Sequence, residues 1–398
     1  MKVVKYLLLA LGGVVVLVAV AVALVLATFD PNKYKSEIAK AVQDRTGRTL
    51  AIGGPIGLSF FPSIGVAVSK VSLSEPSSDR IFARVDRARV SLALLPLLSK
   101  RVVVDRVILS GLDVDLVQGK GGRANFADLA GAGGPSASRQ APQRAAAPVD
   151  IAGIEIRAST VGWRDESSGN RYKATIDELK TGRIANGVPG KLSLAARVEA
   201  TQPKADYQLR LSGEYRVDFE KRAFALSGMD LRISDGTQGS KAPPLSLRGD
   251  VEFDSSPQAI RFTITADQVN LDRYLPPPAK AGAPAAGGAA AGEGPSAARR
   301  EEPIDLSALK ALNLKGDLKI DQLIASNVKL QKVHLGVRAA EGRIEAAPLT
   351  ADLYQGSLAG TASANAHTNR FALKADLGGV ALGPLLHDAL SNDLLEGR

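Results

Sequence analysis

The residues best suited to chemistry are three histidines and a close pair of aspartates. His334, His367 and His387 lie far apart in the sequence, and none has a neighbour at a spacing typical of metal ligands. Asp113 and Asp115 are two residues apart, a spacing that places both carboxylates on one face of a strand. Aspartates in such a position are usually solvated. We therefore predict solvated or structural roles for all five and no metal site.

Other reactive groups are scarce. The chain has no cysteine, which excludes disulfides, thiolate catalysis and cysteine zinc sites. The run from Gly53 to Gly57 lacks the Lys-Ser/Thr of a phosphate-binding loop and predicts a β-turn. Trp163, the only tryptophan, precedes a polar segment and is expected at a strand end before a hairpin turn. No catalytic residues and no cofactor are predicted, so an enzyme is the least favoured class of function.

The composition indicates a chain that folds with few aromatic side chains. Hydrophobic residues make up 45% of the 398 residues and aromatic residues 5%, so leucine, valine, isoleucine and alanine must supply the buried surface. The net charge of +9 comes from basic residues interleaved with acids, without a run of five like charges. No basic stripe carries stacking aromatics, which argues against nucleic-acid binding and leaves some attraction to anionic lipid as an expectation.

An uncharged segment near the start predicts a membrane-spanning helix over residues 6–27. As a helix it would measure about 33 Å, close to the roughly 30 Å hydrocarbon thickness of a bilayer. The run is longer than the roughly 7–15 residues of a typical signal-peptide core, which disfavours cleavage. Lys2 and Lys5 precede it, but further basic residues follow over 33–48, so charge alone leaves the sidedness open.

A second helix is expected directly after this segment. Asp30 suits an N-cap position and Gly47 a C-terminal stop. Between them, Tyr34, Ile38 and Val42 follow the i, i+4, i+8 spacing of an apolar stripe. Such a short amphipathic helix either covers the first strands or rests on the bilayer surface, and we expect packing against the core.

Most of the remaining chain alternates between apolar and polar residues with a period of two. Over residues 207–219 every odd-numbered position is apolar or glycine and every even-numbered position is polar. This one-sided alternation predicts antiparallel strands with one wet face and one apolar face. The pattern recurs, with varying strength, at 85–93, 112–116, 192–200, 245–253, 260–267, 318–335 and 371–377.

Two segments rich in alanine, glycine and proline interrupt the strands. Residues 131–149 and 276–302 lack large apolar side chains and are predicted to be disordered linkers. They divide the body into an α+β unit over 28–130, an antiparallel β unit over 150–275, and a β unit over 303–398 that ends in a helix near Pro384–Leu395.

The predicted helices are too few to cover the apolar faces of a dozen or more strands. Apolar surface left in water costs about 25 cal/mol per Å². The sheet therefore either folds onto itself around a closed core or forms an open apolar gutter filled by acyl chains. Alternation alone favours the closed core. The candidate lining of a gutter is the apolar set Leu209, Leu211, Tyr215, Val217, Leu247, Val251, Phe253, Phe262 and Ile264.

Short phrases along nearly the whole chain are similar to the AsmA family of Gram-negative envelope proteins. Each phrase is short and built from common residues, whereas their collinear order together with the N-terminal anchor is fairly specific. The phrases are Phe29-Asp30-Pro31-Asn32, Thr46-Gly47-Arg48, Ile52-Gly53-Gly54-Pro55-Ile56, Phe60-Phe61-Pro62-Ser63-Ile64, Val71-Ser72-Leu73-Ser74, Leu94-Leu95-Pro96-Leu97-Leu98, Val107-Ile108-Leu109-Ser110-Gly111-Leu112, Leu271-Asp272-Arg273-Tyr274-Leu275-Pro276, Leu353-Tyr354-Gln355-Gly356-Ser357 and Pro384-Leu385-Leu386.

The resemblance implies a topology, a fold and a class of function. It implies residues 1–5 in the cytoplasm, a single span in the inner membrane and a periplasmic body built as a long curled, taco-like β-sheet, as in TamB-like and other bridge-like lipid-transfer proteins. It also implies a part in outer-membrane biogenesis, with membrane phospholipids as partners. A non-enzymatic scaffold that affects outer-membrane protein assembly and protein targeting is the alternative. In the family, further strands follow the phrase that ends here at Arg398.

Overall fold

Strands make up nearly all of the part of the chain that the structure describes. The computed structural model describes residues 30–59, 64–93, 104–129, 149–202, 204–237, 242–255, 258–273 and 313–390. The chain divides into unit 1, Met1–Leu211 with Asp235–Ser240, and unit 2, Ser212–Ser234 with Lys241–Arg398. The predicted span at 6–27 and the predicted linkers, apart from Val149, lie outside the described residues, so the three-part division stays a prediction.

The strands of unit 1 pair as one open ladder. β3, β4 and β5 are antiparallel neighbours, β5 is followed in space by β7, and β8 and β10 complete the series. The short β1 and β2 both pair with β3, and β6 pairs with β5 and β9. The strands are β1 (Leu50–Ile52), β2 (Gly57–Ser59), β3 (Ile64–Ser74), β4 (Ile81–Leu92), β5 (Val104–Gln118), β6 (Asp150–Ile151), β7 (Ile154–Asp165), β8 (Arg171–Thr181), β9 (Ile184–Ala185) and β10 (Pro189–Thr201).

Unit 2 is a second ladder in which each strand from β12 to β19 pairs with the next along the chain. A 3-10 turn, Leu271–Arg273, follows β14. The strands are β12 (Ala223–Asp235), β13 (Leu245–Ser255), β14 (Gln258–Asn270), β15 (Leu314–Ala325), β16 (Val328–Ala340), β17 (Arg343–Leu353), β18 (Gly356–Asn365) and β19 (Arg370–Gly378). β11 (Lys204–Asp218) contains the boundary between the two units.

The prediction of a purely antiparallel sheet is wrong at three pairs of strands. β5 pairs in parallel with β6 and with β7, and β14 pairs in parallel with β15. Parallel neighbours need a connection of a dozen or more residues, because the chain must return to the same end of the sheet. The long connections between Gln118 and Ile154 and between Asn270 and Leu314 meet that need, so the sheet is mixed where the two predicted linkers fall.

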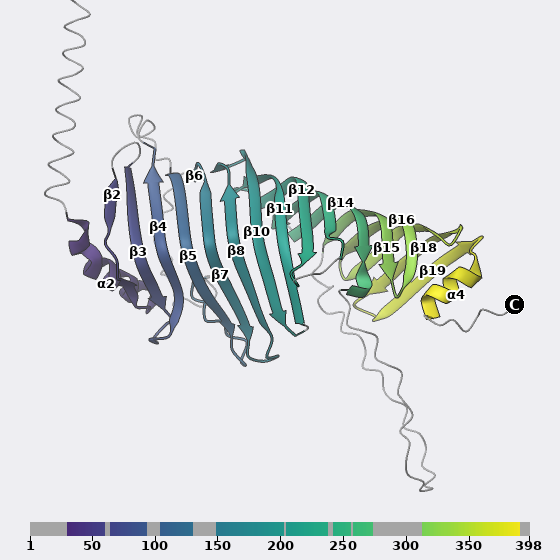
Figure 1. Ribbon diagram of the computed structural model, residues 1–398, viewed down its shortest axis with the longest axis horizontal. Coiled ribbons are helices and arrows are strands. Elements are labelled where there is room, and N and C mark those ends of the chain that lie inside the picture. The colour runs from purple at the N-terminus through teal and green to yellow at the C-terminus, as the bar shows by residue number, and fades with distance from the viewer. Residues whose placement is uncertain are drawn as a thin grey trace, which may run out of the picture. The chain divides into compact units, whose positions relative to one another are not determined.

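Helices are few and lie at two places in the described chain. A 3-10 turn, Pro31–Tyr34, leads into α2 (Lys35–Thr46), which lies beside β2 and β3 in Figure 1. The predicted ends are confirmed, since Asp30 caps the 3-10 turn and Gly47 closes α2 with a φ of 66°. The expected packing of α2 against the first strands is confirmed in part, because the helix contacts β1 and has one half-buried side. None of its residues is buried, and Ile38, on the predicted apolar stripe, is 41% exposed.

The second helix, α4 (Leu382–Leu390), confirms the predicted C-terminal helix over its described part. Among the described residues, none of the helices is both long and apolar enough to cross a bilayer.

Candidate functional site

The predicted lining residues lie on β11, β13 and β14. Leu209 and Leu211 belong to unit 1, and the other seven belong to unit 2. Along β11 the odd-numbered residues from 207 to 217 are less exposed than the polar residues between them, as the alternation predicts. Tyr215 is 5% exposed, whereas the other eight residues are half-buried. The described residues therefore do not close these side chains into a dry core.

In unit 2 the apolar side chains form rows that run across the strands. The register of seven successive strand pairs places small or apolar residues opposite one another without interruption. One row consists of Leu226, Val251, Phe262, Gly316, Val337, Ala346, Ala362 and Leu373. Seven strand spacings of about 4.8 Å make this row roughly 34 Å long. One face of unit 2 is thus an apolar strip that crosses all eight strands.

The opposite face of the same strands is wet and charged. Arg261 pairs with Glu252 at 2.9 Å and with Asp254 at 2.6 Å, and Arg248 pairs with Asp267 at 3.0 Å. All of these side chains are about one-third or more exposed, so the pairs contribute little to stability and mainly keep this face in water. Each ladder therefore presents its two faces to different environments.

A line of interrupted pairing crosses the strands of unit 1. The pairing is interrupted at Lys70 on β3, Asp86 on β4, Gly111 on β5, Ala158 on β7 and Asp177 on β8, and these positions face one another in successive pairs. Three of them have positive φ angles, which are 52° at Lys70, 64° at Gly111 and 46° at Ala158. The register is the same on both sides of the interruption in each pair except β8–β10, where Asp177 is an extra residue and forms a β-bulge. We call this line of five interrupted positions the crease.

Each strand has an additional residue on its polar side at the crease. On β3, Ser69 and Lys70 are successive polar residues between the apolar residues Val68 and Val71. The additional residue keeps the apolar residues before and after the crease on one face of the strand.

Ser159 stabilises the crease from the apolar side. Its side chain is fully buried, and its hydroxyl accepts a hydrogen bond from the Leu112 backbone N–H at 3.2 Å. The same hydroxyl donates to the backbone carbonyl of Arg157 at 2.9 Å. These backbone groups lie next to Gly111 and Ala158, where the pairing of β5 with β7 is interrupted. Ser159 thus supplies hydrogen bonds where two neighbouring strands lack their usual partners.

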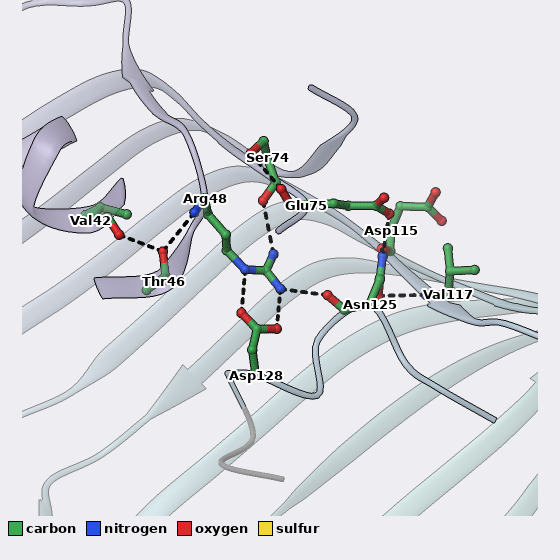
Figure 2. Close-up of polar contacts among 9 residues, drawn as sticks. All are labelled: Val42, Thr46, Arg48, Ser74, Glu75, Asp115, Val117, Asn125 and Asp128. Atoms are coloured by element: carbon green, nitrogen blue, oxygen red, sulfur yellow. Dashed lines mark hydrogen bonds and ion pairs between the residues drawn. The ribbon is translucent and has the colours of Figure 1, made fainter. Parts of the chain in front are cut away.

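A buried arginine network joins α2 to the sheet, as Figure 2 shows. Arg48 directly follows the C-terminal Gly47 of α2 and has no solvent exposure. Its Nε and Nη2 donate to both carboxylate oxygens of Asp128, at 2.8 and 2.6 Å, and the guanidinium also donates to the carbonyls of Ser74 and Asn125. The hydrogen bond from Arg48 lowers the pKa of the Asp128 carboxyl below its ordinary value. The guanidinium also lies 4.5 Å from the centre of the Phe82 ring.

The loop that carries Asp128 is also tied to β5 and β7. The Asn125 side chain accepts from the backbone N–H of Val117 at 3.0 Å and donates to the carbonyl of Asp115 at 2.9 Å. The Phe126 ring lies 5.9 Å from the ring of Trp163, which is near the end of β7. Trp163 precedes a hairpin turn as predicted, and its contact with this loop is an addition that the sequence did not reveal.

Helix α4 is held against β16 and β17 by a polar cluster in unit 2. The Asp388 carboxylate accepts from the Tyr354 hydroxyl at 2.6 Å and pairs with the Lys329 ammonium at 3.0 Å. These contacts lower the pKa of Asp388, whereas burial raises the pKa of Tyr354. The cluster fixes the angle of a helix whose Leu382 and Leu386 side chains are 65% and 39% exposed.

The residues considered for chemistry are not brought together. His334 lies 2.8 Å from Asp317, and His367 lies 3.0 Å from the Glu341 carbonyl, so each has a local polar partner. Asp115 forms a half-exposed ion pair with Arg164 at 2.7 Å. No group of three or more potential ligands could hold a metal ion within the described ranges. The glycine run 53–57 connects β1 to β2, as a turn segment rather than as a phosphate-binding loop that opens a helix.

These features define a class of protein: a mainly β chain whose long, open and mixed sheets are apolar on one face and charged on the other. The chain belongs to the AsmA family, whose family model matches residues 1–245 and 247–398. It is 25% identical over 268 residues to "Protein AsmA" of Escherichia coli (strain K12), an alignment that covers 65% of this chain and 40% of that relative. The match thus spans less than half of the relative's length. No solved structure matches the chain.

Proposed function

We propose that this protein holds and conducts phospholipid acyl chains along the apolar face of each unit, as part of outer-membrane biogenesis. The observation that carries the proposal is the uninterrupted row of small or apolar residues across the eight strands of unit 2, which is half-buried except at its two ends, where Leu226 is buried and Leu373 is exposed. A row of roughly 34 Å is about twice the 15 Å or so that one leaflet's hydrocarbon occupies. Burial of acyl chains supplies the driving force, and no cofactor is needed.

Membership of the family supports an envelope location for the proposed activity. Membership of the AsmA family suggests an envelope protein, and the uncharged segment at 6–27 would anchor it in the inner membrane with the body in the periplasm. Phospholipids leaving that membrane would meet the apolar faces directly. The crease in unit 1 supports the same proposal, because the apolar positions stay on one face of the strands across it.

The test is site-specific photo-crosslinking in cells, followed by mass spectrometry of the adducts. A crosslinker at Val251, on the apolar face of β13, should capture phospholipid. The matched control is Glu252, the next residue along the strand, which points to the charged face and pairs with Arg261. Phospholipid should also co-purify with the chain. The proposal fails if Val251 captures only protein, or if Val251 and Glu252 capture lipid equally.

A scaffold role is the second candidate, and β19 favours it. Every residue of β19 is exposed, and Leu373 is 73% exposed. Within the described residues β19 pairs with β18 along one edge only. An exposed edge with apolar side chains can add a strand from another polypeptide. A crosslinker at Leu373 that captures an outer-membrane assembly protein, while Val251 captures no lipid, would favour the scaffold.

A further inference from the structure

Helix α2 is held on unit 1 in a fixed orientation. At its N-terminal end the Asn32 side chain accepts a hydrogen bond from the Ile56 backbone N–H at 2.9 Å. At its C-terminal end Gly47 closes the helix and the buried Arg48 network follows. The half-buried side of the helix consists of Lys35, Ala39, Val42 and Thr46. Because both ends are held, the opposite sides of α2 point in defined directions.

One exposed flank of α2, about 100° around the helix from its half-buried side, has a composition typical of a membrane interface. Tyr34, Ile38, Ala41 and Arg45 follow the i, i+4, i+7, i+11 spacing of one helix side, and all four are exposed. Tyr34 is 45% exposed and Ile38 is 41% exposed. The exposed charges of α2 are balanced, with Lys40 and Arg45 against Glu37 and Asp44. Amphipathic helices that carry aromatic and basic side chains beside an apolar stripe lie in the plane of the bilayer interface.

The chain itself would bring this helix to the bilayer. The predicted span ends at Ala27, and the 3-10 turn that leads into α2 begins at Pro31. Four residues of extended chain reach about 14 Å at most. A helix tethered this close to the surface meets the interface at a high effective concentration, so a small apolar stripe suffices.

We infer that α2 docks on the surface of the membrane that anchors the chain, with Ile38 and Ala41 at the lipid interface. This inference rests on the inner-membrane anchor of the proposed function and adds to it a contact that sets the orientation of unit 1. The occupant is a phospholipid interface, rather than a second copy of the chain or another protein.

The test uses spin labels, for which a chain without cysteine needs no background removal. The full chain is reconstituted in vesicles of phosphatidylethanolamine and phosphatidylglycerol, with a single label at Ala41→Cys or, on the opposite exposed side of the helix, at Ser36→Cys. The label at Ala41 should collide more with oxygen and less with a nickel chelate than the label at Ser36, as expected for a depth of about 5–10 Å in the interface.

Two charge variants test which side of α2 contacts the lipid. Ile38→Asp should shift the Ala41 label toward the water-like collision pattern of the Ser36 label, whereas Ser36→Asp, the same charge change on the other side, should leave the Ala41 label unchanged. Ile38 is exposed, so this substitution should leave the fold intact, and Trp163 fluorescence checks that it does.

Three results would overturn the inference. They are equal nickel accessibility at both labels, shielding of Ala41 from both reagents, which indicates a protein contact, and insensitivity of the Ala41 label to Ile38→Asp. Flotation of every sample with the vesicles distinguishes failure of this inference from failure of the proposed function. A chain that floats with two water-exposed labels lacks only the α2 contact, whereas a chain that does not float lacks the anchor.

Discussion

Asp128→Asn should destabilise unit 1 by about 2–3 kcal/mol, because it leaves the Arg48 guanidinium buried without a charge partner. Removing one partner of a buried ion pair usually costs about 3–5 kcal/mol. Arg48 has no exposure, but the Asp128 side chain is 27% exposed, and water at that end screens part of the loss. The asparagine also keeps one oxygen that can accept from Arg48, so the lower end of the range applies.

The sole tryptophan provides the assay. Trp163 lies against Phe126, in the loop that Asp128 holds, so its fluorescence should report loss of this packing during urea unfolding. With a slope of about 2 kcal/mol per molar urea, the midpoint should fall by roughly 1–1.5 M. Asp115→Asn is the matched control, because it breaks the Arg164–Asp115 pair, in which both side chains are about 40% exposed. That loss should stay below about 1 kcal/mol.

The comparison between the two variants tests whether burial of Arg48 sets the strength of its ion pair. Equal midpoint shifts for Asp128→Asn and Asp115→Asn would mean that burial of Arg48 does not set the strength of its ion pair. An unchanged midpoint for Asp128→Asn would mean that the loop does not stabilise this part of unit 1. Either result would refute the structural role given to the network in Figure 2.

Three further predictions concern the apolar face, the crease and α4. Val251→Asp should reduce co-purifying phospholipid, measured by mass spectrometry, while its half-buried position limits the loss of stability to about 1 kcal/mol. Ser159→Ala should lower the stability of unit 1 by about 1–3 kcal/mol in urea melts, because it leaves two backbone groups unpaired, whereas Ser193→Ala, on an exposed site, should be neutral. The hydrogen bond from Tyr354 lowers the pKa of Asp388. The docking of α4 should therefore persist above the ordinary carboxyl pKa of about 3.9 and weaken as the pH falls through the lowered pKa of Asp388. Hydrogen exchange in α4 that becomes faster only below the ordinary carboxyl pKa would confirm this prediction.

The strands and their faces could be predicted from local pattern alone. Residues 207–219 alternate without exception, and β11 covers them to Asp218 with its odd-numbered side chains less exposed. Period-two alternation is a local property, so it needs no knowledge of the partner strand. The start of the 3-10 turn and the end of α2 were predictable for the same reason, because the roles of Asp30 and Gly47 depend only on backbone geometry within one turn.

Features that depend on distant partners could not be predicted in this way. The sequence contains many arginines, and the partner of Arg48, Asp128, lies 80 residues further along the chain. No local pattern therefore marks Arg48 as buried. The parallel pairing of β5 with β7 has no local signature either, because a strand carries the same alternation in both orientations. The two long linkers were the available clue, since only a long connection permits a parallel neighbour.

The crease, by contrast, is visible in the sequence as an irregularity in the period-two alternation. Strict alternation through an additional residue would move every later apolar side chain to the wrong face. The apolar positions instead step by three at the crease, from Val68 to Val71 on β3, from Leu109 to Leu112 on β5 and from Ile176 to Leu179 on β8. In one strand alone, such a step counts against strand structure. Taken together across neighbouring strands, the steps indicate that the apolar face stays continuous across the crease, as the proposed acyl-chain surface requires.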